Sequence, residues 1–223
     1  MEKQFRINDK LESSLREIIQ QADDLQSQLL YKPADVSLGG LNSLLADAQY
    51  ALDRARRQII LEERINQITQ EQIEEIAGNA ERMMEGPHSR TRFHCSEAFV
   101  ISVGSYLFGE VPDQIRRMVT GLAGGVGGSH EEMCGALVGG ILLIGGIYGR
   151  ARPTEDDQPA YQLSVHYREK FIERLGGAKC HQFRDNGYGS DGHTSCGQLV
   201  SRAVKVFFAA MAERSKVLVL EDE

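Results

Sequence analysis

The chain has 223 residues, of which 41% are hydrophobic and 26% are charged, and its formal net charge at pH 7 is −7. This size allows one ordinary domain with an extension, and the acidic balance argues against a nucleic-acid groove, which needs a concentrated basic face. The first residues are charged and contain no apolar segment typical of an export signal. The most apolar run, 134–149, is shorter than the roughly 20 residues that span a bilayer. We therefore expect a cytoplasmic protein without a membrane span.

Residues 1–86 are expected to form a helical hairpin extension. Residues 8–30 and 41–70 carry leucines and isoleucines three and four positions apart, and the intervening segment, 31–40, contains a proline and two adjacent glycines. A further helical stretch follows and ends at Gly86. A hairpin alone buries little surface, so this one is expected to serve dimerisation or docking, and the protein is expected to be a homo-oligomer through these helices.

Residues 87–223 also show helical patterns rather than the alternation of strands, so the predicted fold class is all-α, with a compact helical domain after the extension. Ser129 is expected to cap the third of these helices, which places Cys134 about one turn inside it. The expected helices cover 94–108, 111–123, 129–149, 158–177 and 195–216.

Glycines are unusually frequent in the middle of this domain. The stretch GLAGGVGGSH, 121–130, is not a nucleotide-triphosphate loop, because it lacks Gly-Lys-Ser/Thr and follows a helical rather than an extended pattern. Gly135 and Gly139 lie inside the next predicted helix, where a glycine costs roughly 1 kcal/mol relative to alanine. We expect them to allow close approach of a neighbouring helix or of a cofactor.

All four cysteines of the chain lie in the second region, at Cys95, Cys134, Cys180 and Cys196. Three of them are expected near helix N-termini, where unpaired N–H groups and the helix dipole favour a thiolate over a thiol. No two are spaced as C-x-x-C, so any common site has to be built by the fold. In a reducing cytoplasm, such cysteines more often bind metals or are redox-active than form structural disulfides.

The order of these motifs resembles a family of redox-active proteins named for a C-GCAxxG-C-C signature. The resemblance is carried by CSEAFVISVGSYL at 95–107, by TGLAGGVGGSHEEMCGALVGGILLIGGIYGR at 120–150, in which CGALVG stands for the central motif, and by Cys180 and Cys196. It covers about residues 90–212. The resemblance implies a small α-helical domain whose four cysteines are redox-active or bind a cluster, as in the similar domain of the split-Soret cytochromes, which is associated with an iron–sulfur centre. It implies no particular reaction, so whether the protein is an enzyme stays open.

Three functions remain open. The first is a four-thiolate site that binds an iron–sulfur cluster, preferably two-iron two-sulfur, and exchanges electrons with an unidentified redox partner protein; zinc in the same site is its structural variant. The second is thiol–disulfide exchange without a metal. The third is a helical interaction protein in which the cysteines only pack.

Three histidines are secondary candidates for the same site. His94 and His181 each adjoin a cysteine, and His130 is expected one helical turn before Cys134, on the same face. Each could be a ligand or could donate a hydrogen bond to a sulfur, with Gly135 and Gly139 beside them.

Overall fold

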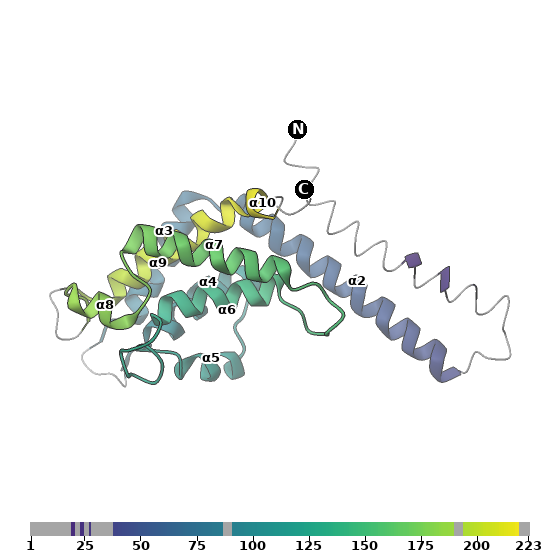
Figure 1. The fold of residues 1–223 in the computed structure, drawn as a ribbon, viewed down its shortest axis with the longest axis horizontal. Coiled ribbons are helices and arrows are strands. Elements are labelled where there is room, and N and C mark those ends of the chain that lie inside the picture. The colour runs from purple at the N-terminus through teal and green to yellow at the C-terminus, as the bar shows by residue number, and fades with distance from the viewer. Residues whose placement is uncertain are drawn as a thin grey trace. The chain divides into compact units, whose positions relative to one another are not determined.

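The computed structural model describes residues 19–20, 23–24, 27, 38–86, 91–189 and 194–218 (Figure 1). Over these residues the secondary structure consists of helices α2 to α10, with no strand beyond two isolated β-bridges. The all-α prediction is confirmed. In the same part of the chain, no helix has both the length and the apolar character needed to cross a membrane.

The chain divides into two compact units, Met1–Arg64 and Ile65–Glu223. Helix α2 (Leu38–Gln67) confirms the helix expected over 41–70. The helix expected over 8–30 lies outside the described residues, apart from 19–20, 23–24 and 27, which are helical, so the hairpin itself is not described. The expectation that these helices join two copies of the chain stays a prediction.

Helix α3 (Gln70–Met83) lies in the second unit, although the sequence pattern grouped it with the extension. Thr69 starts it with a capping box: the Gln72 amide donates to Thr69 Oγ1 at 3.2 Å, and the Thr69 amide donates to Gln72 Oε1 at 2.9 Å. The helix packs on α9 (Cys196–Ala212) and on α4 (Cys95–Phe108). The division of function at residue 86 stays a prediction.

The core of the second unit lies between four of its longer helices, and each of the four lies within a predicted helix. Helix α4 packs on α6 (Gly135–Tyr148), α6 packs on α7 (Gln158–Leu175), and α7 packs on α9. Buried rings join them edge to face: the Phe207 ring centroid lies 5.8 Å from that of Phe99 and 5.5 Å from that of Tyr167. Such aromatic pairs contribute about 0.5–1.5 kcal/mol beyond the area that they bury.

Three short helices complete the unit. They are α5 (Asp113–Thr120), which Pro112 precedes, α8 (Cys180–Asp185) and α10 (Arg214–Val217). Phe183 of α8 packs edge to face on Phe171 of α7, with ring centroids 5.9 Å apart, so an aromatic contact ties this six-residue helix to the core. The sequence pattern did not predict α8.

Residues 129–134, predicted to be the start of a helix, are not helical, and a left-handed turn precedes them. Gly124, Gly125, Val126, Gly127 and Gly128 all have positive φ angles, between 61° and 76°, and therefore form a left-handed turn. This turn closes through backbone bonds such as that from the Gly127 amide to the Gly121 carbonyl, at 2.8 Å. His130 also has a positive φ, of 65°, which a right-handed helix does not allow, so α6 has to start later.

Helix α6 begins at Gly135, with Cys134 as its N-cap. Cys134 is extended because the bridge between Met133 and Lys179 holds it, with its amide donating to the Ala178 carbonyl at 2.8 Å. The prediction that Ser129 caps this helix is therefore wrong, and so is the prediction of Cys134 one turn inside it.

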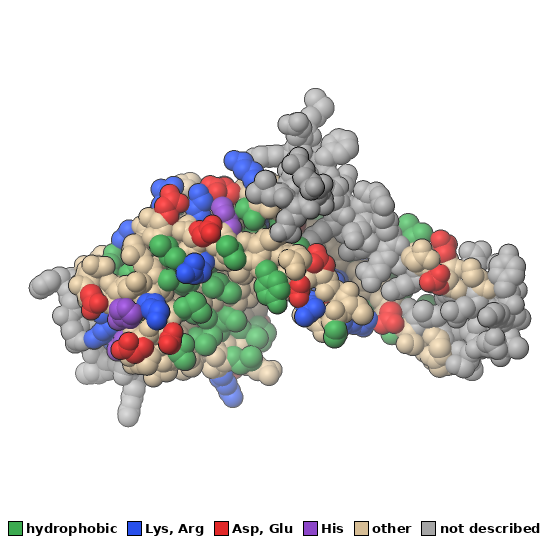
Figure 2. All heavy atoms as spheres, in the orientation of Figure 1, with side chains coloured by type: hydrophobic (Ala, Val, Ile, Leu, Met, Phe, Trp, Pro, Cys, Tyr) green, Lys and Arg blue, Asp and Glu red, His purple; other side chains and the backbone are tan. Residues whose placement is uncertain are grey.

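Hydrophobic side chains gather over α6 and α7 on the face shown in Figure 2. Leu142 of α6 and Tyr161 and Val165 of α7 are among the exposed large hydrophobic side chains. Gly145 and Gly146 of α6 are also exposed. One side of the second half of α6 therefore meets solvent, although its other residues are buried, as most of the first half is.

Candidate four-cysteine site

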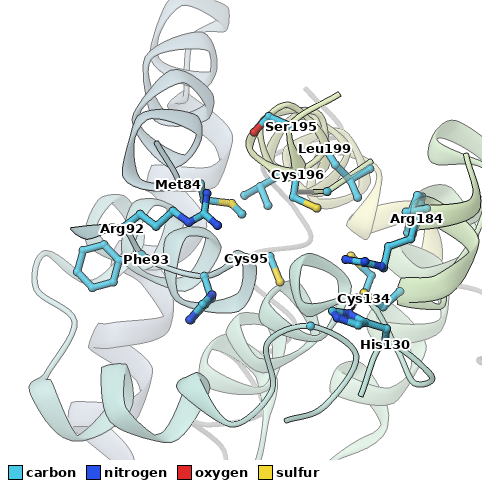
Figure 3. Close-up of a pocket in the computed structure, with 16 residues that line it drawn as sticks. Met84, Arg92, Phe93, Cys95, His130, Cys134, Arg184, Ser195, Cys196 and Leu199 are labelled. Carbon is cyan, nitrogen blue, oxygen red and sulfur yellow. Dashed lines mark hydrogen bonds between the residues drawn. The ribbon is translucent and has the colours of Figure 1, made fainter. Parts of the chain in front are cut away.

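Each of the four cysteines stands at the N-terminus of a different helix. Cys95, Cys180 and Cys196 are the first residues of α4, α8 and α9, and Cys134 is the N-cap of α6. All four line one pocket of about 390 Å³, and the labelled Cys95, Cys134 and Cys196 face a common space in Figure 3. The fold thus brings together cysteines that the sequence separates by up to 101 positions, from 95 to 196.

Cys134 and Cys180 are joined through the backbone. The Cys134 amide donates to the Ala178 carbonyl and the Cys180 amide donates to the Glu132 carbonyl, each at 2.8 Å, on either side of the antiparallel bridge between Met133 and Lys179. Each cysteine directly follows one residue of the bridged pair. The bridge therefore brings the starts of α6 and α8 together.

Cys95 is placed by close contact between α4 and α6. A β-carbon added to Gly135 would overlap Cys95 Sγ and would lie 3.1 Å from the Ser96 amide nitrogen. One turn further along, a β-carbon on Gly139 would lie 3.1 Å from the Phe99 ring. Both glycines thus permit the close approach expected of them, and at Gly135 what approaches is the sulfur itself.

Cys196 follows a loop whose two ends are pinned together. The Gly189 amide donates to the Thr194 carbonyl at 2.9 Å, and the Thr194 amide donates to the Gly187 carbonyl at 3.0 Å. Ser195 then caps α9 by accepting a hydrogen bond from the Gly197 amide at 3.0 Å. These bonds fix the start of α9 and with it the Cys196 sulfur.

All four thiols have pKa values raised above the ordinary value. Burial is the main cause for each: it raises the pKa of Cys95, Cys134 and Cys180, and it raises that of Cys196 to about 11. The helix starts act in the opposite direction, since backbone N–H groups of Gly124, Ser96 and Gly135 lower the pKa of Cys95, but they do not overcome burial. The expected thiolates are therefore thiols at neutral pH unless a cation offsets their charge.

The sulfurs also repel one another, with Cys95 in the central position. After burial, the largest effect that raises the pKa of Cys134, of Cys180 and of Cys196 is in each case the charge of Cys95. Cys180 has the same effect, to a smaller extent, on Cys134 and Cys196. Four thiolates could coexist here only with bound positive charge between them.

The three predicted histidines differ in whether they line the pocket. His94 lies just before α4 and His130 lies in the loop before α6, and both line the pocket. His130 Nδ1 lies 3.5 Å from Cys180 Sγ, which is a contact with a different cysteine from the one expected, because 130–134 is not helical. His181 is not among the residues that line the pocket, and its Nδ1 is buried without a hydrogen-bond partner in the described part of the chain.

Two arginines of the pocket were not predicted. Arg92 lies three residues before Cys95, and Arg184 lies one turn after Cys180 on α8. Residues four apart on a helix share a face, so Arg184 could have been placed beside Cys180 had α8 been expected. For Arg92 the sequence carries no such signal.

Four cysteines are the ligand set of two-iron clusters and of structural zinc. As the described residues stand, no three His, Cys, Asp or Glu side chains are close enough together to hold a metal ion.

The family model described as "Putative redox-active protein (C_GCAxxG_C_C)" matches residues 93–209, just over half of the chain, and its range contains all four cysteines. No curated protein and no solved structure matches the chain. At the central motif the chain reads Cys134-Gly135-Ala136 where the signature has Gly-Cys-Ala, so its cysteine stands one position earlier. The chain belongs to this family of redox-active proteins.

Proposed function

We propose that the four cysteines bind an iron–sulfur cluster, preferably of the two-iron two-sulfur type, and that the protein carries single electrons to and from a redox partner protein. The observation that supports this most is that four helix N-termini each bring one cysteine to the same pocket. When bound, such a cluster supplies one-electron chemistry at a potential set by its surroundings.

The pKa values favour metal binding over thiol exchange. A thiol attacks a disulfide only as the thiolate, and burial raises the pKa of all four groups. Repulsion from other cysteines raises the pKa of Cys134, Cys180 and Cys196 further, and a bound cation would offset that repulsion. Exchange at neutral pH has no such compensation, and this difference supports metal binding.

The backbone is arranged to stabilise sulfur charge once the protons are gone. Cys95 Sγ lies near the N–H groups of Ser96, Gly124 and Gly135, which come from three different segments. Hydrogen bonds to ligand sulfurs stabilise the more negative, reduced form of a cluster and raise its potential. The left-handed turn that carries Gly124 would thus be part of the electronic surroundings of the site.

The test is to purify the full chain under anaerobic conditions and to measure iron, zinc, acid-labile sulfide and the visible spectrum. We expect about two irons per chain and the visible absorbance of an iron–sulfur chromophore. Serine variants of Cys95, Cys134, Cys180 and Cys196, made one at a time, should lose most of the iron, and circular dichroism shows whether each remains helical.

Other outcomes would overturn the proposal. Stoichiometric zinc without colour would indicate the structural variant of the site. A colourless, metal-free protein whose free thiols disappear and return reversibly would indicate disulfide exchange. If the serine variants retained all properties of the parent chain, including its cellular role, the cysteines would only pack.

A further inference from the structure

The two residues that follow Cys95 are both bound to the end of α5. Ser96 is fully buried, and its hydroxyl donates to the Val119 carbonyl at 2.8 Å. Glu97 accepts a hydrogen bond from the Thr120 hydroxyl at 2.6 Å. Each bond joins residues 23 positions apart. The start of α4 and the end of α5 are therefore held together by two adjacent side-chain bonds.

Glu97 reaches α5 with one carboxylate oxygen and caps its own helix with the other. Its Oε2 accepts a hydrogen bond from the His94 amide at 2.7 Å, just before α4. Its Oε1 lies 2.6 Å from Thr120 Oγ1, closer than the Arg116 carbonyl, which lies 3.2 Å from the same hydroxyl. A hydroxyl has one proton and a charged acceptor binds it more strongly, so Thr120 donates to Glu97. Capping α4 alone would not need this second bond.

The carbonyl that Ser96 binds is also the point where the left-handed turn begins. The Leu122 amide donates to the same Val119 oxygen at 3.1 Å. The residues that follow are closed by further backbone bonds, such as that from the Gly128 amide to the Ala123 carbonyl at 3.1 Å. The turn is thus one hydrogen-bonded unit, and Ser96 holds the atom at its start.

The turn in its place contacts the sulfur site. The Gly124 amide is one of the three N–H groups near Cys95 Sγ, and both residues line the pocket. A β-carbon added to Gly125 would lie 2.8 Å from Cys180 Cβ. A shift of the turn away from α4 would therefore withdraw an N–H group from Cys95 and open the sulfur to solvent.

We propose that Ser96 is a positioning residue for the Cys95 sulfur: its hydroxyl holds the left-handed turn so that the Gly124 amide stays against Cys95 Sγ. The bond between Thr120 and Glu97 is a second and weaker link, because Thr120 is exposed and water competes for its hydroxyl. The placement of the sulfur does not depend on iron. Its consequence for a cluster rests on the proposed function, since a hydrogen bond to a ligand sulfur raises the reduction potential.

Alkylation of the metal-free full chain by iodoacetamide, followed by mass spectrometry of each cysteine, tests the placement. In S96A we expect Cys95 to react about fivefold faster, the effect of losing one ordinary hydrogen bond, while Cys196 reacts at the parent rate. The variant should fold, because the Val119 carbonyl keeps its bond from Leu122. Circular dichroism checks that it remains helical.

The matched control is S102A, which removes another buried serine from α4. The Ser102 hydroxyl contacts Met83 Sδ of α3 at 3.6 Å, so its loss should leave the Cys95 rate unchanged. T120V breaks only the weaker link and should speed the reaction of Cys95 about twofold, whereas T120S keeps the hydroxyl and should match the parent chain.

The midpoint potential of the iron-containing protein is the second measurement, because a merely structural role would not change it. We expect a more negative potential in S96A and an unchanged one in S102A. An unchanged potential in S96A would overturn the role of the turn in the electron-transfer centre.

The positioning role is overturned if Cys95 reacts at the parent rate in both S96A and T120V. It is also overturned if S96A speeds Cys95 and Cys196 equally, which would indicate general loosening of the unit. If no sample binds iron, the proposed function fails, but the alkylation rates still decide whether Ser96 places the sulfur.

Discussion

Both halves of α6 contain glycines, but the surroundings of these glycines differ. In the first half, a β-carbon on Gly135 would overlap Cys95 Sγ, one on Gly139 would lie 3.1 Å from Phe99, and one on Gly140 would overlap the Tyr167 ring. In the second half, a β-carbon on Gly145 would meet nothing within 4 Å. One on Gly146 would lie 3.2 Å from the edge of the Phe108 ring.

This difference shows which glycines shape the site. Each glycine inside a helix costs roughly 1 kcal/mol relative to alanine, wherever it stands. In the first half of α6 that cost is offset by the packing of α4 and α7 directly against its backbone. In the second half, Gly145 is exposed and nothing in the structure explains it.

The largest effect is expected for Gly140→Ala. The added methyl group would overlap Tyr167, a fully buried residue that packs on Phe171 and Phe207 and so has no free space to move into. Overpacking of this kind typically lowers the free energy of unfolding by about 1–3 kcal/mol. Urea unfolding of the metal-free protein measures it, and an unchanged midpoint would contradict the close packing of α6 on α7.

Gly135→Ala should act on the site more than on stability. The new methyl group displaces Cys95 Sγ, one of the four sulfurs of the pocket, so we expect metal affinity to fall about 10–100-fold, as it does when groups that orient ligands are changed. Competition with a chelator measures this affinity. The matched control is Gly145→Ala in the same helix, and equal affinities for the two variants would show that Gly135 does not position the sulfur.

Alkaline pH should destabilise the end of the unit that holds the sulfurs. In the metal-free protein the pKa of Cys196 is raised by burial and by Cys95 from 9.0 to about 11. Below about pH 9 this thiol is protonated in both states. Between about pH 9 and 11 it ionises only in the unfolded chain, so its contribution to stability is lost over this window. We expect Cys196→Ser to remove about 1–2 kcal/mol of the pH-dependent loss, after allowance for partial solvent exposure.

Urea unfolding of the parent chain and of Cys196→Ser at pH 8 and at pH 11 measures the difference. Tyrosines and lysines titrate in the same range in both proteins, so only the difference between the two chains reports on the thiol. Parallel pH profiles would mean that the Cys196 sulfur is solvated rather than buried beside Cys95.

The elements predicted correctly are those whose signals are local. The apolar residues that indicate α2, α4, α7 and α9 lie within each helix, and Gly176, in the left-handed conformation, ends α7 inside the predicted range. The start of α6 could not be predicted, because the bridge to Lys179 that holds Cys134 extended joins residues 46 positions apart. Helix α8 is too short to show a period.

The order of the cysteines in the sequence predicted which residues line the site, but it did not predict the direction in which their pKa values shift. A helix start is visible in the sequence and predicts a lowered thiol pKa, whereas the burial that reverses it depends on which helices cover the sulfur. His130 lines the pocket, as predicted, but the reason given for it was wrong. The left-handed turn, and not a helical turn, brings it to Cys180. The position of Arg184 in the pocket depends on α8 and could not be predicted without it.

The smallest effect is expected for Gly145→Ala, and it has the opposite sign. The site is exposed and leaves space for the methyl group, so the substitution should gain helix propensity and raise the free energy of unfolding by up to about 1 kcal/mol, with metal affinity unchanged. Urea unfolding together with chelator competition measures both quantities. A loss of stability would mean that another surface packs closely on this face. The two halves of α6 would then differ in what packs on them, not in whether they are packed or exposed.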